Sequence, residues 1–230
     1  MTRWGIVTGL KSEARLAENA ARAAGVHGKL LVRCDGPGPA QARIATRALA
    51  AQGATGFLSL GLAGGLVSGL VPGSLLLPAE IVEGGGVRFA ADAAAHARAA
   101  SALVAETPRT DPLFGAEQVV ATPEEKSELA RRFAVAAVDM ESGGVAEVAR
   151  ELGLPFLALR AVADPAERVI PGPAQAGMSE DGSVNAFAVL AQLAVEPQSV
   201  AAVLQLARDT AEGNASLGRA VRLLLPALVR

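Results

Sequence analysis

The sequence predicts a single α/β domain in which a mostly parallel sheet is covered by helices on both faces. Short apolar segments alternate with longer segments of helical periodicity, which is typical of β-α-β units. Several strand candidates are apolar throughout, as strands are when neither face of their sheet meets water. The chain has 230 residues, of which 51% are hydrophobic, so one large domain can form its core without disulfides or metal.

The predicted strands are short apolar runs bounded by glycine, proline or polar residues. They cover residues 4–8, 29–34, 55–60, 74–82, 86–90, 134–140 and 155–163. The predicted helices lie between them and have apolar residues at helical spacing. They cover residues 12–24, 39–52, 92–105, 123–132 and 142–152. Gly84, Gly85 and Gly86 separate two of the strands and predict a hairpin, so we expect a mixed sheet.

The last third of the chain departs from this alternation. Residues 165–182 contain several prolines and glycines and are too long for an ordinary connection, so we expect a lid. Residues 185–230 predict two or three helices, with breaks near 196–197 and 213–214. No repeat, low-complexity tract or linker interrupts the sequence. We therefore expect residues 1–230 to form one domain.

Composition and charge exclude several classes of function. The formal net charge of −2 offers no electrostatic footprint for nucleic acid or an anionic membrane. No apolar run reaches the roughly 20 residues that span a bilayer. The N-terminus has no signal-peptide pattern and there is one cysteine, Cys34, so we expect a cytoplasmic protein. His27, His96 and Cys34 lie far apart in the sequence and predict no metal site.

Ligands of parallel-sheet folds gather where the strands end, so polar residues at those ends are the candidates for chemistry. The first candidate is Glu13, which follows the first strand and lies in the first turn of the next helix. The helix dipole stabilises a carboxylate there by up to ~1 kcal/mol, so we expect Glu13 to be ionised. The alternative is an acidic residue that merely favours a helix start.

The second candidate is a glycine-rich turn at residues 61–66, Gly-Leu-Ala-Gly-Gly-Leu. Glycines after a buried strand allow backbone amides to approach a ligand closely. The segment superficially matches a dinucleotide fingerprint, but the first β-α turn lacks one and a strand rather than a long helix follows. It therefore favours a nucleoside or an anion over a nicotinamide cofactor.

The third candidate is the strand end at Asp139, Met140 and Glu141. A carboxylate at Glu141 can accept two hydrogen bonds from a vicinal diol, which is what ribose offers. The alternative is that Asp139 and Glu141 cap the following helix.

The fourth candidate is Asp164, where another apolar strand ends in an acid. A partly buried carboxylic acid with a raised pKa can donate a proton to a leaving group. The alternative is a structural ion pair with Arg160 or Arg168.

With these segments in order, the chain resembles the purine nucleoside phosphorylase and methylthioadenosine/adenosylhomocysteine nucleosidase superfamily over nearly its whole length. The likeness rests on the glycine-rich segment at 61–66, Val-Asp-Met-Glu-Ser at 138–142, Arg-Ala-Val-Ala-Asp-Pro-Ala at 160–166, and an N-terminal Gly-Ile-Val with a glutamate eight residues on. Gly-Pro-Gly-Pro at 36–39 and Val-Thr-Gly-Leu-Lys-Ser-Glu-Ala-Arg at 7–15 make it most similar to the hopanoid-associated phosphorylase branch. That branch is thought to remove adenine from adenosylhopane, which leaves a ribosyl- or phosphoribosyl-hopane.

The resemblance implies a three-layer α/β/α fold with a mixed, partly barrel-like central sheet and no cofactor, phosphate being a co-substrate in some members. It implies that Asp164 protonates the purine at N7, that Glu141 binds the ribose hydroxyls beside Met140, and that Glu13 activates water. The remaining implied site residues contact the nucleophile and sugar through their backbone, or lie near the base. The first group is Gly61, Ala63 and Gly64, and the second is Gln118, Val119 and Val120.

The chain departs from the phosphorolytic members at two positions of the phosphate site. Those members place an arginine two residues before the glycine of this strand end and a serine just after it, where this chain has Ser59 and Leu62. Arg15, Arg33 or Arg43 would have to bind phosphate instead. Water and phosphate are therefore both open as the nucleophile.

We expect the partner to be a small nucleoside, free or lipid-linked, with the apolar C-terminal helices lining a groove for the lipid. We expect no nucleic-acid partner and no membrane span, and a homo-oligomer, with a dimer favoured. Two rival functions are a nucleoside-binding module without catalysis and a dinucleotide-dependent oxidoreductase. Neither explains acids at successive strand ends as well.

Overall fold

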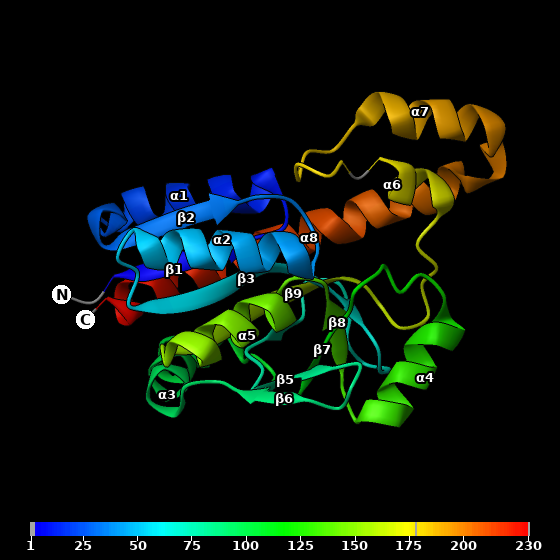
Figure 1. The fold of residues 1–230 in the computed structure, drawn as a ribbon. Helices are drawn as coiled ribbons and strands as arrows, with labels where there is room; N and C mark the ends of the chain where they lie inside the picture. The colour runs from blue at the N-terminus through cyan, green and yellow to red at the C-terminus, as the bar shows by residue number, and fades with distance from the viewer. Residues whose placement is uncertain (1–2, 178, 230) are drawn as a thin grey trace.

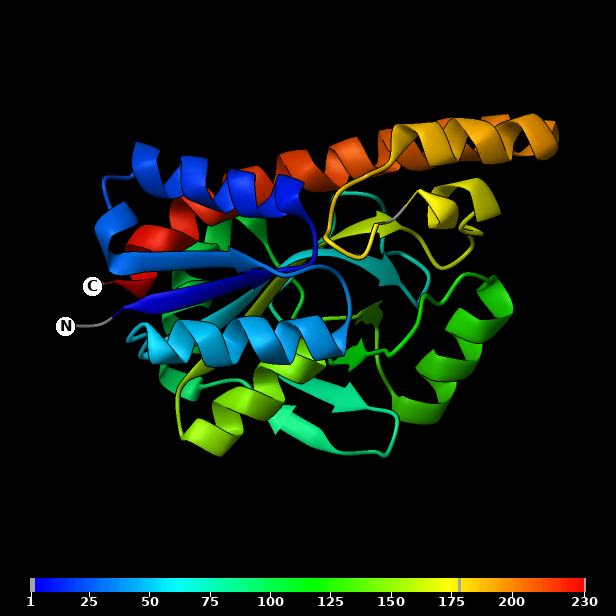
Figure 2. The same ribbon diagram turned by 45° about the horizontal axis from the view of Figure 1, so that its top comes forward.

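Helices cover both faces of a twisted mixed sheet that runs through the middle of the molecule (Figures 1 and 2). The computed structural model describes residues 3–177 and 179–229, and within them nine strands form this one sheet. The strands are β1 (Trp4–Thr8), β2 (Leu30–Cys34), β3 (Gly56–Gly65), β4 (Leu75–Leu76), β5 (Glu80–Glu83), β6 (Arg88–Ala90), β7 (Leu113–Gly115), β8 (Ala137–Asp139) and β9 (Phe156–Asp164). The predicted α/β class with a mixed sheet is confirmed.

Within the described residues the chain forms eight α-helices. They are α1 (Lys11–Ala23), α2 (Pro39–Ala51), α3 (Ala93–Ala102), α4 (Pro123–Phe133), α5 (Ser142–Leu152), α6 (Gly172–Ala176), α7 (Ala186–Val195) and α8 (Val200–Leu228), with short 3₁₀ turns at His27–Lys29, Val104–Glu106 and Pro197–Ser199. Helices α1, α3 and α8 share one apolar core with the sheet, and α2 and α5 share the other (Figure 2). Neighbouring strand residues belong to different cores, Ile6 to the first and Val7 to the second, because side chains alternate across a strand.

Strand β3 is the longest strand, and the sheet divides along it. One edge of β3 pairs in parallel with β9 over most of its length. Its other edge pairs with β1 near its start and with β8 at its end, the latter antiparallel. The sheet also bends back where β4 pairs with β9. As a result the carboxyl ends of β1, β3 and β9 and the end of β8 gather around one place.

The strand predictions differ from the structure between β4 and β7 in two respects. The predicted strand at 74–82 is two short strands, β4 and β5, because the chain between them bonds across to Arg109 and Thr110 through the backbone of Leu77 and Ala79. Strand β7, only three residues long, was not predicted. The predicted hairpin is confirmed, since β5 pairs antiparallel with β6.

The predicted break at 213–214 is also wrong, whereas the one at 196–197 is confirmed by the 3₁₀ turn between α7 and α8. Helix α8 runs without interruption through Gly213. Glycine is needed at position 213 because α8 packs closely on β9, and not because the helix turns there. A Cβ atom at this position would lie 3.0 Å from the carbonyl oxygen of Val162 in β9.

The chain after β9 leaves the body and returns to it. Helix α6, helix α7 and the adjoining part of α8 project from one corner of the molecule (Figure 1). The stretch predicted as a lid contains α6, and two of the hydrogen bonds that attach it to the body join backbone to backbone. Ile170 N–H donates to Ala121 at 2.9 Å, and the carbonyl of Gly182 accepts from Lys11 N–H at 2.9 Å. None of the helices within the described parts of the chain has the length and apolarity to cross a membrane.

Replacing the two glycines of α8 with alanine tests this account of the helix. Gly218→Ala places a Cβ at ordinary contact, 3.6 Å from Leu16, and should stabilise the protein by up to ~1 kcal/mol through helix propensity. Gly213→Ala has the same gain in helix propensity, but its Cβ crowds the carbonyl of Val162. We therefore expect the free energy of unfolding to fall by about 1–3 kcal/mol. Urea unfolding measures both. Equal stabilisation by the two substitutions would show that the close contact of α8 with β9 is incorrect.

Candidate active site

A cavity of about 170 Å³ opens where β1, β3, β8 and β9 end. Glu13, Glu141 and Asp164 all line it, contributed by α1, by the junction of β8 with α5, and by the last residue of β9. A cavity of about 150 Å³ accommodates a benzene ring, so this one admits a ring-sized group. The three acids that the sequence places at separate strand ends therefore lie around one space.

The other predicted site residues lie at this cavity with one exception. Those that line it are Ala63, Gly64, Gln118, Val119, Val120 and Met140. Gly61 does not line it, and the predicted glycine turn is wrong, because β3 continues as a strand to Gly65. The glycines are needed to let charged side chains approach the strand. A Cβ at Gly61 would lie 2.3 Å from the guanidinium of Arg160, and one at Gly64 would lie 2.9 Å from Asp164 Oδ2.

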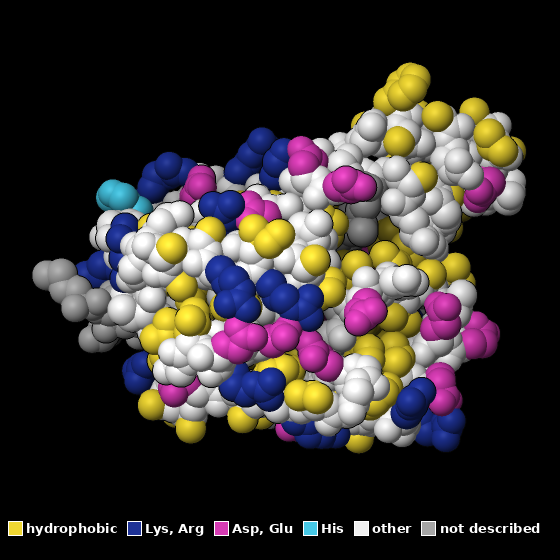
Figure 3. Space-filling model, viewed as in Figure 1, with side chains coloured by type: hydrophobic (Ala, Val, Ile, Leu, Met, Phe, Trp, Pro, Cys, Tyr) yellow, Lys and Arg dark blue, Asp and Glu magenta, His cyan; other side chains and the backbone are white. Residues whose placement is uncertain are grey.

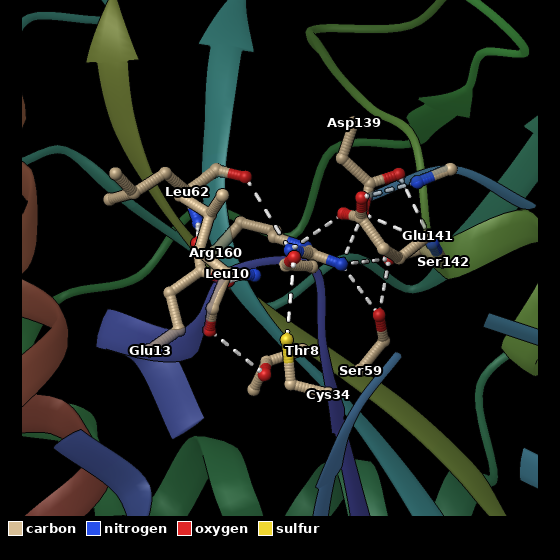
Figure 4. A network of polar contacts seen from close by, with 12 residues as sticks. Thr8, Leu10, Glu13, Cys34, Ser59, Leu62, Asp139, Glu141, Ser142 and Arg160 are labelled. Atoms are coloured by element: carbon tan, nitrogen blue, oxygen red, sulfur yellow. Dashed lines mark hydrogen bonds and ion pairs between the residues drawn. The ribbon is translucent and has the colours of Figure 1, made fainter. Parts of the chain in front are cut away.

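Arg160 lies beneath the cavity with no exposure to solvent (Figure 4). Its Nη2 atom forms an ion pair with Asp139 and donates to Ser59 Oγ at 2.6 Å, and its Nη1 atom lies 3.5 Å from Glu141 Oε2. The predicted alternative, in which Arg160 or Arg168 pairs with Asp164, is wrong. A bulge between β3 and β9 after Val162 directs Arg160 and Asp164 to opposite faces of β9.

Asp139 and Glu141 have different roles at the start of α5. Asp139 caps the helix, since its carboxylate accepts from Ser142 N–H at 3.2 Å and from the Ser142 hydroxyl at 2.5 Å. The capping alternative is thus confirmed for Asp139. Glu141 makes no side-chain cap bond to α5 and accepts instead from Gly38 N–H at 3.1 Å. It also packs so closely on Gly9 that a Cβ there would lie 2.6 Å from Glu141 Oε1.

Burial raises the pKa of Glu141 to about 7, against the lowering effect of Arg160. Asp139 and Glu13 add to the rise, because like charges nearby disfavour ionisation. Glu141 is therefore poised to change its charge near neutral pH.

Glu13 is buried at the start of α1, where its carboxylate accepts from Leu62 N–H at 3.0 Å and from Leu10 N–H at 2.9 Å. Burial raises its pKa, and the charge of Arg160 opposes this rise. The expectation that the helix start keeps Glu13 ionised considered the dipole alone. Removal from water is the larger effect here.

Asp164 faces the cavity from the other side of β9, and its partner is a lysine that no sequence motif marks. Lys126 of α4 donates from Nζ to Asp164 Oδ2 at 2.7 Å. Burial raises the pKa of Asp164, and Lys126 opposes this rise. Lys126 stands in Glu-Glu-Lys-Ser-Glu, which has the composition of a solvated helix face, so no local signal marked it. Arg168 pairs instead with Asp209 of α8 at 3.1 Å.

Cationic side chains do not reach the cavity wall. Among the described residues that line it, none is Lys, Arg or His. The arginines considered for phosphate lie elsewhere: Arg33 pairs with Asp35 at 2.7 Å, Arg43 pairs with Glu147 at 2.5 Å, and Arg15 lines a separate hollow beside α8. Within the described residues, no group of three or more His, Cys, Asp or Glu side chains is placed to hold a metal ion.

Comparison with known protein families matches residues 22–196 to the phosphorylase superfamily. The chain belongs to this superfamily. This membership confirms the predicted nucleoside phosphorylase fold and the prediction of an enzyme. A search of curated protein sequences found no match.

Several solved structures share the fold of this superfamily member at low sequence identity. A futalosine hydrolase mutant of Helicobacter pylori strain 26695 has a TM-score of 0.75 and 17% identity, and the alignment covers 100% of this chain and 99% of that one. A 5′-methylthioadenosine/S-adenosylhomocysteine nucleosidase from Neisseria meningitidis, in complex with methylthio-immucillin-A, has a TM-score of 0.72 and 18% identity, with 98% and 99% covered. At these identities the likeness shows the fold alone.

Removing Arg160 tests the electrostatic arrangement of the site. Arg160→Met leaves buried carboxylates without their cation, so we expect the free energy of unfolding to fall by about 3–5 kcal/mol. The folded-state pKa values of Glu13 and Glu141 already exceed their unfolded values and would rise further. A carboxyl group whose folded-state pKa is raised stabilises the fold at low pH and loses that contribution as pH rises. The stability that Arg160→Met loses relative to wild type should therefore grow between about pH 5 and pH 8.

The matched control is Arg47→Met, which breaks an exposed ion pair with Glu151 and should cost less than about 1 kcal/mol at either pH. Urea unfolding at both pH values measures the two variants. A defect in Arg160→Met that does not depend on pH would contradict this arrangement.

Proposed function

We propose that the protein hydrolyses the N-glycosidic bond of a purine nucleoside. The observation that carries the proposal is the convergence of Glu13, Glu141 and Asp164 from distant segments on one cavity. All three are buried, and burial raises the pKa of each. Perturbed acids that share a cleft are typical of catalytic sites.

In the proposed reaction the bond between C1′ and N9 breaks, and its electron pair passes to the purine. Asp164 donates a proton to N7, which offsets the charge on the departing base. Glu141 accepts hydrogen bonds from the ribose hydroxyls and holds the sugar. Water attacks C1′ and loses a proton to Glu13, so the products are the free base and the free sugar. General acid catalysis of this kind contributes ~10²–10⁴-fold to the rate.

Water is favoured over phosphate by the charges around the cavity. A phosphate dianion would meet the carboxylates of Glu13 and Glu141 with no cation among the described lining residues. Ser59 is fully buried beneath the cavity and bonded to Arg160. A neutral nucleophile avoids this repulsion, and Glu13 is a base for it.

The test is release of free base from adenosine in phosphate-free buffer. We expect turnover that added phosphate does not increase, with free ribose as the second product. Asp164→Asn should lower kcat by at least about 10²-fold while the protein stays folded. The control is Asp111→Asn, whose carboxylate pairs with Arg109 outside the cavity.

Three results would contradict the proposal in different ways. Turnover that requires phosphate would show a phosphorylase. Binding of purine nucleosides without release of base would show a binding module. Full activity in Asp164→Asn would remove Asp164 from the mechanism.

The resemblance to the hopanoid-associated branch leads us to propose an adenine nucleoside with a large apolar group at C5′, as in adenosylhopane. The support is a C-terminal arm, residues 183–207, with a single charged residue, Glu196. None of the residues of α7 is buried, and Phe187, Leu190 and Val195 are 80%, 65% and 75% exposed. Figure 3 shows hydrophobic side chains exposed on this projection.

The C-terminal arm is attached beside the cavity. The chain before it supplies Ile170 to the cavity wall. Gly182, where the arm begins, bonds to Lys11, next to the cavity residue Leu10. A group at C5′ that leaves the cavity on this side would meet the apolar surface of the arm, and each Å² of apolar area buried there contributes about 25 cal/mol.

Substitution in the arm tests this substrate. Phe187→Ser combined with Leu190→Ser should raise KM for adenosylhopane by roughly tenfold and leave KM for adenosine unchanged, because only the apolar group contacts the arm. The control is Val104→Ser, which changes an exposed valine outside the arm. If the arm substitutions leave adenosylhopane kinetics unchanged, or if methylthioadenosine is the better substrate of the wild-type protein, the small-nucleoside alternative is correct.

A further inference from the structure

Lys126 is a fully buried cation on α4 and pairs with Asp164, an acid that lines the cavity. Its ammonium group donates to three oxygen atoms: Asp164 Oδ2 at 2.7 Å, the carbonyl of Pro165 at 2.9 Å and the carbonyl of Arg168 at 3.0 Å. An ammonium group has three N–H donors, so each has a partner. The side chain is therefore held in one position.

The place of Lys126 in its helix is unfavourable for a positive charge. Thr122 and Glu125 form a capping box and Pro123 occupies the first turn, which together define the start of α4. Lys126 follows directly, near the positive end of the helix dipole. A buried ammonium there is destabilised both by the dipole and by loss of water. Its ion pair with Asp164, an acid of the cavity, compensates this unfavourable position.

We propose that Lys126 is a positioning residue for the reaction, which fixes the carboxyl group of Asp164 and compensates the negative charge that Asp164 bears once its proton has passed to the base. This inference rests on the proposed function. Lys126 binds Oδ2, which leaves Oδ1 as the oxygen that meets the purine. In the step itself the Oδ1–H bond breaks, a bond from N7 to hydrogen forms, and Lys126 keeps all its protons.

The other charged groups around Asp164 do not replace Lys126. Asp209 of α8 is negative and adds to the rise in the pKa of Asp164. Arg168, on the segment that follows β9, is directed to Asp209 through its side chain. Among the described side chains, Lys126 is the cation that contacts Asp164.

Lys126 also connects Asp164 to the rim of the cavity. Its bonds to the carbonyls of Pro165 and Arg168 hold the turn that directly precedes Ile170, which lines the cavity. The same side chain therefore fixes the acid and the chain that covers it.

The test compares Lys126→Gln, which keeps a donor but loses the charge, with Lys126→Arg, which keeps the charge. We expect Lys126→Gln to lower kcat for adenosine by at least about tenfold with KM within about threefold, because the charge acts on the proton transfer. The pKa of Asp164 rises without Lys126, so the alkaline limb of kcat should move to higher pH. Lys126→Arg should recover part of the lost kcat, and its alkaline limb should lie closer to that of the wild type. Arg131→Met, which removes a 76% exposed cation from the same helix, is the control.

Stability against pH is a second readout that does not depend on turnover. The folded-state pKa of Asp164 exceeds its unfolded value, so its contribution to stability is lost as pH rises. Without Lys126 this loss should be larger, and Tm of Lys126→Gln should fall relative to wild type between about pH 4 and pH 8. Relative to Asp164→Asn, the double variant Lys126→Gln/Asp164→Asn should show no such added pH dependence, because residue 164 no longer carries a carboxyl group that ionises.

The outcomes separate this inference from the proposed function. If Asp164→Asn is inactive but Lys126→Gln has wild-type kcat and an unmoved alkaline limb, Lys126 is only structural and the inference is wrong. If Asp164→Asn is fully active, the proposed mechanism fails, and the Tm measurement still decides whether Lys126 compensates Asp164. A Tm difference that does not change with pH would overturn that compensation.

Discussion

The buried guanidinium of Arg160 joins the parts of the chain that form the site. It is completely removed from water, and such a group is tolerated only when carboxylates and hydrogen-bond acceptors surround it. Asp139 and Glu141 supply the charge, and Ser59 supplies a hydroxyl from β3. The same contacts require a glycine at position 61, since any side chain would enter the space of Arg160. The positions of β3, β8 and β9 are thus coupled through one side chain.

Two cations on opposite faces of β9 give the acids of the cavity different surroundings. Arg160 lies below Glu13 and Glu141, whereas Lys126 contacts Asp164. The bulge in β9 makes this separation possible, because without it the side chains at 160 and 164 would share a face. Environments that differ in this way allow similar acids to take different roles, one as proton donor and others as acceptors.

The sequence predicted what local pattern can specify, namely the α/β class, most strands and helices, and three acids at strand ends. It missed features that depend on contacts between distant segments. The glycines of β3 indicate a turn in the sequence, because the side chains that crowd them come from the distant segments α1 and β9. Gly213 indicates a helix break for the same reason, since the carbonyl that it approaches belongs to β9. Lys126 lies among glutamates, and only the packing of α4 against the end of β9 reveals that it is buried.

The proposed reaction requires a purine nucleoside to bind with its glycosidic bond among Glu13, Glu141 and Asp164. A crystal structure of Asp164→Asn with adenosine bound tests it most directly, since the variant slows turnover and keeps the shape of the cavity. We expect purine N7 within hydrogen-bonding distance of residue 164, the ribose hydroxyls on Glu141, and C1′ facing Glu13. Adenosine bound outside this cavity, or with its ribose directed away from Glu141, would contradict the account.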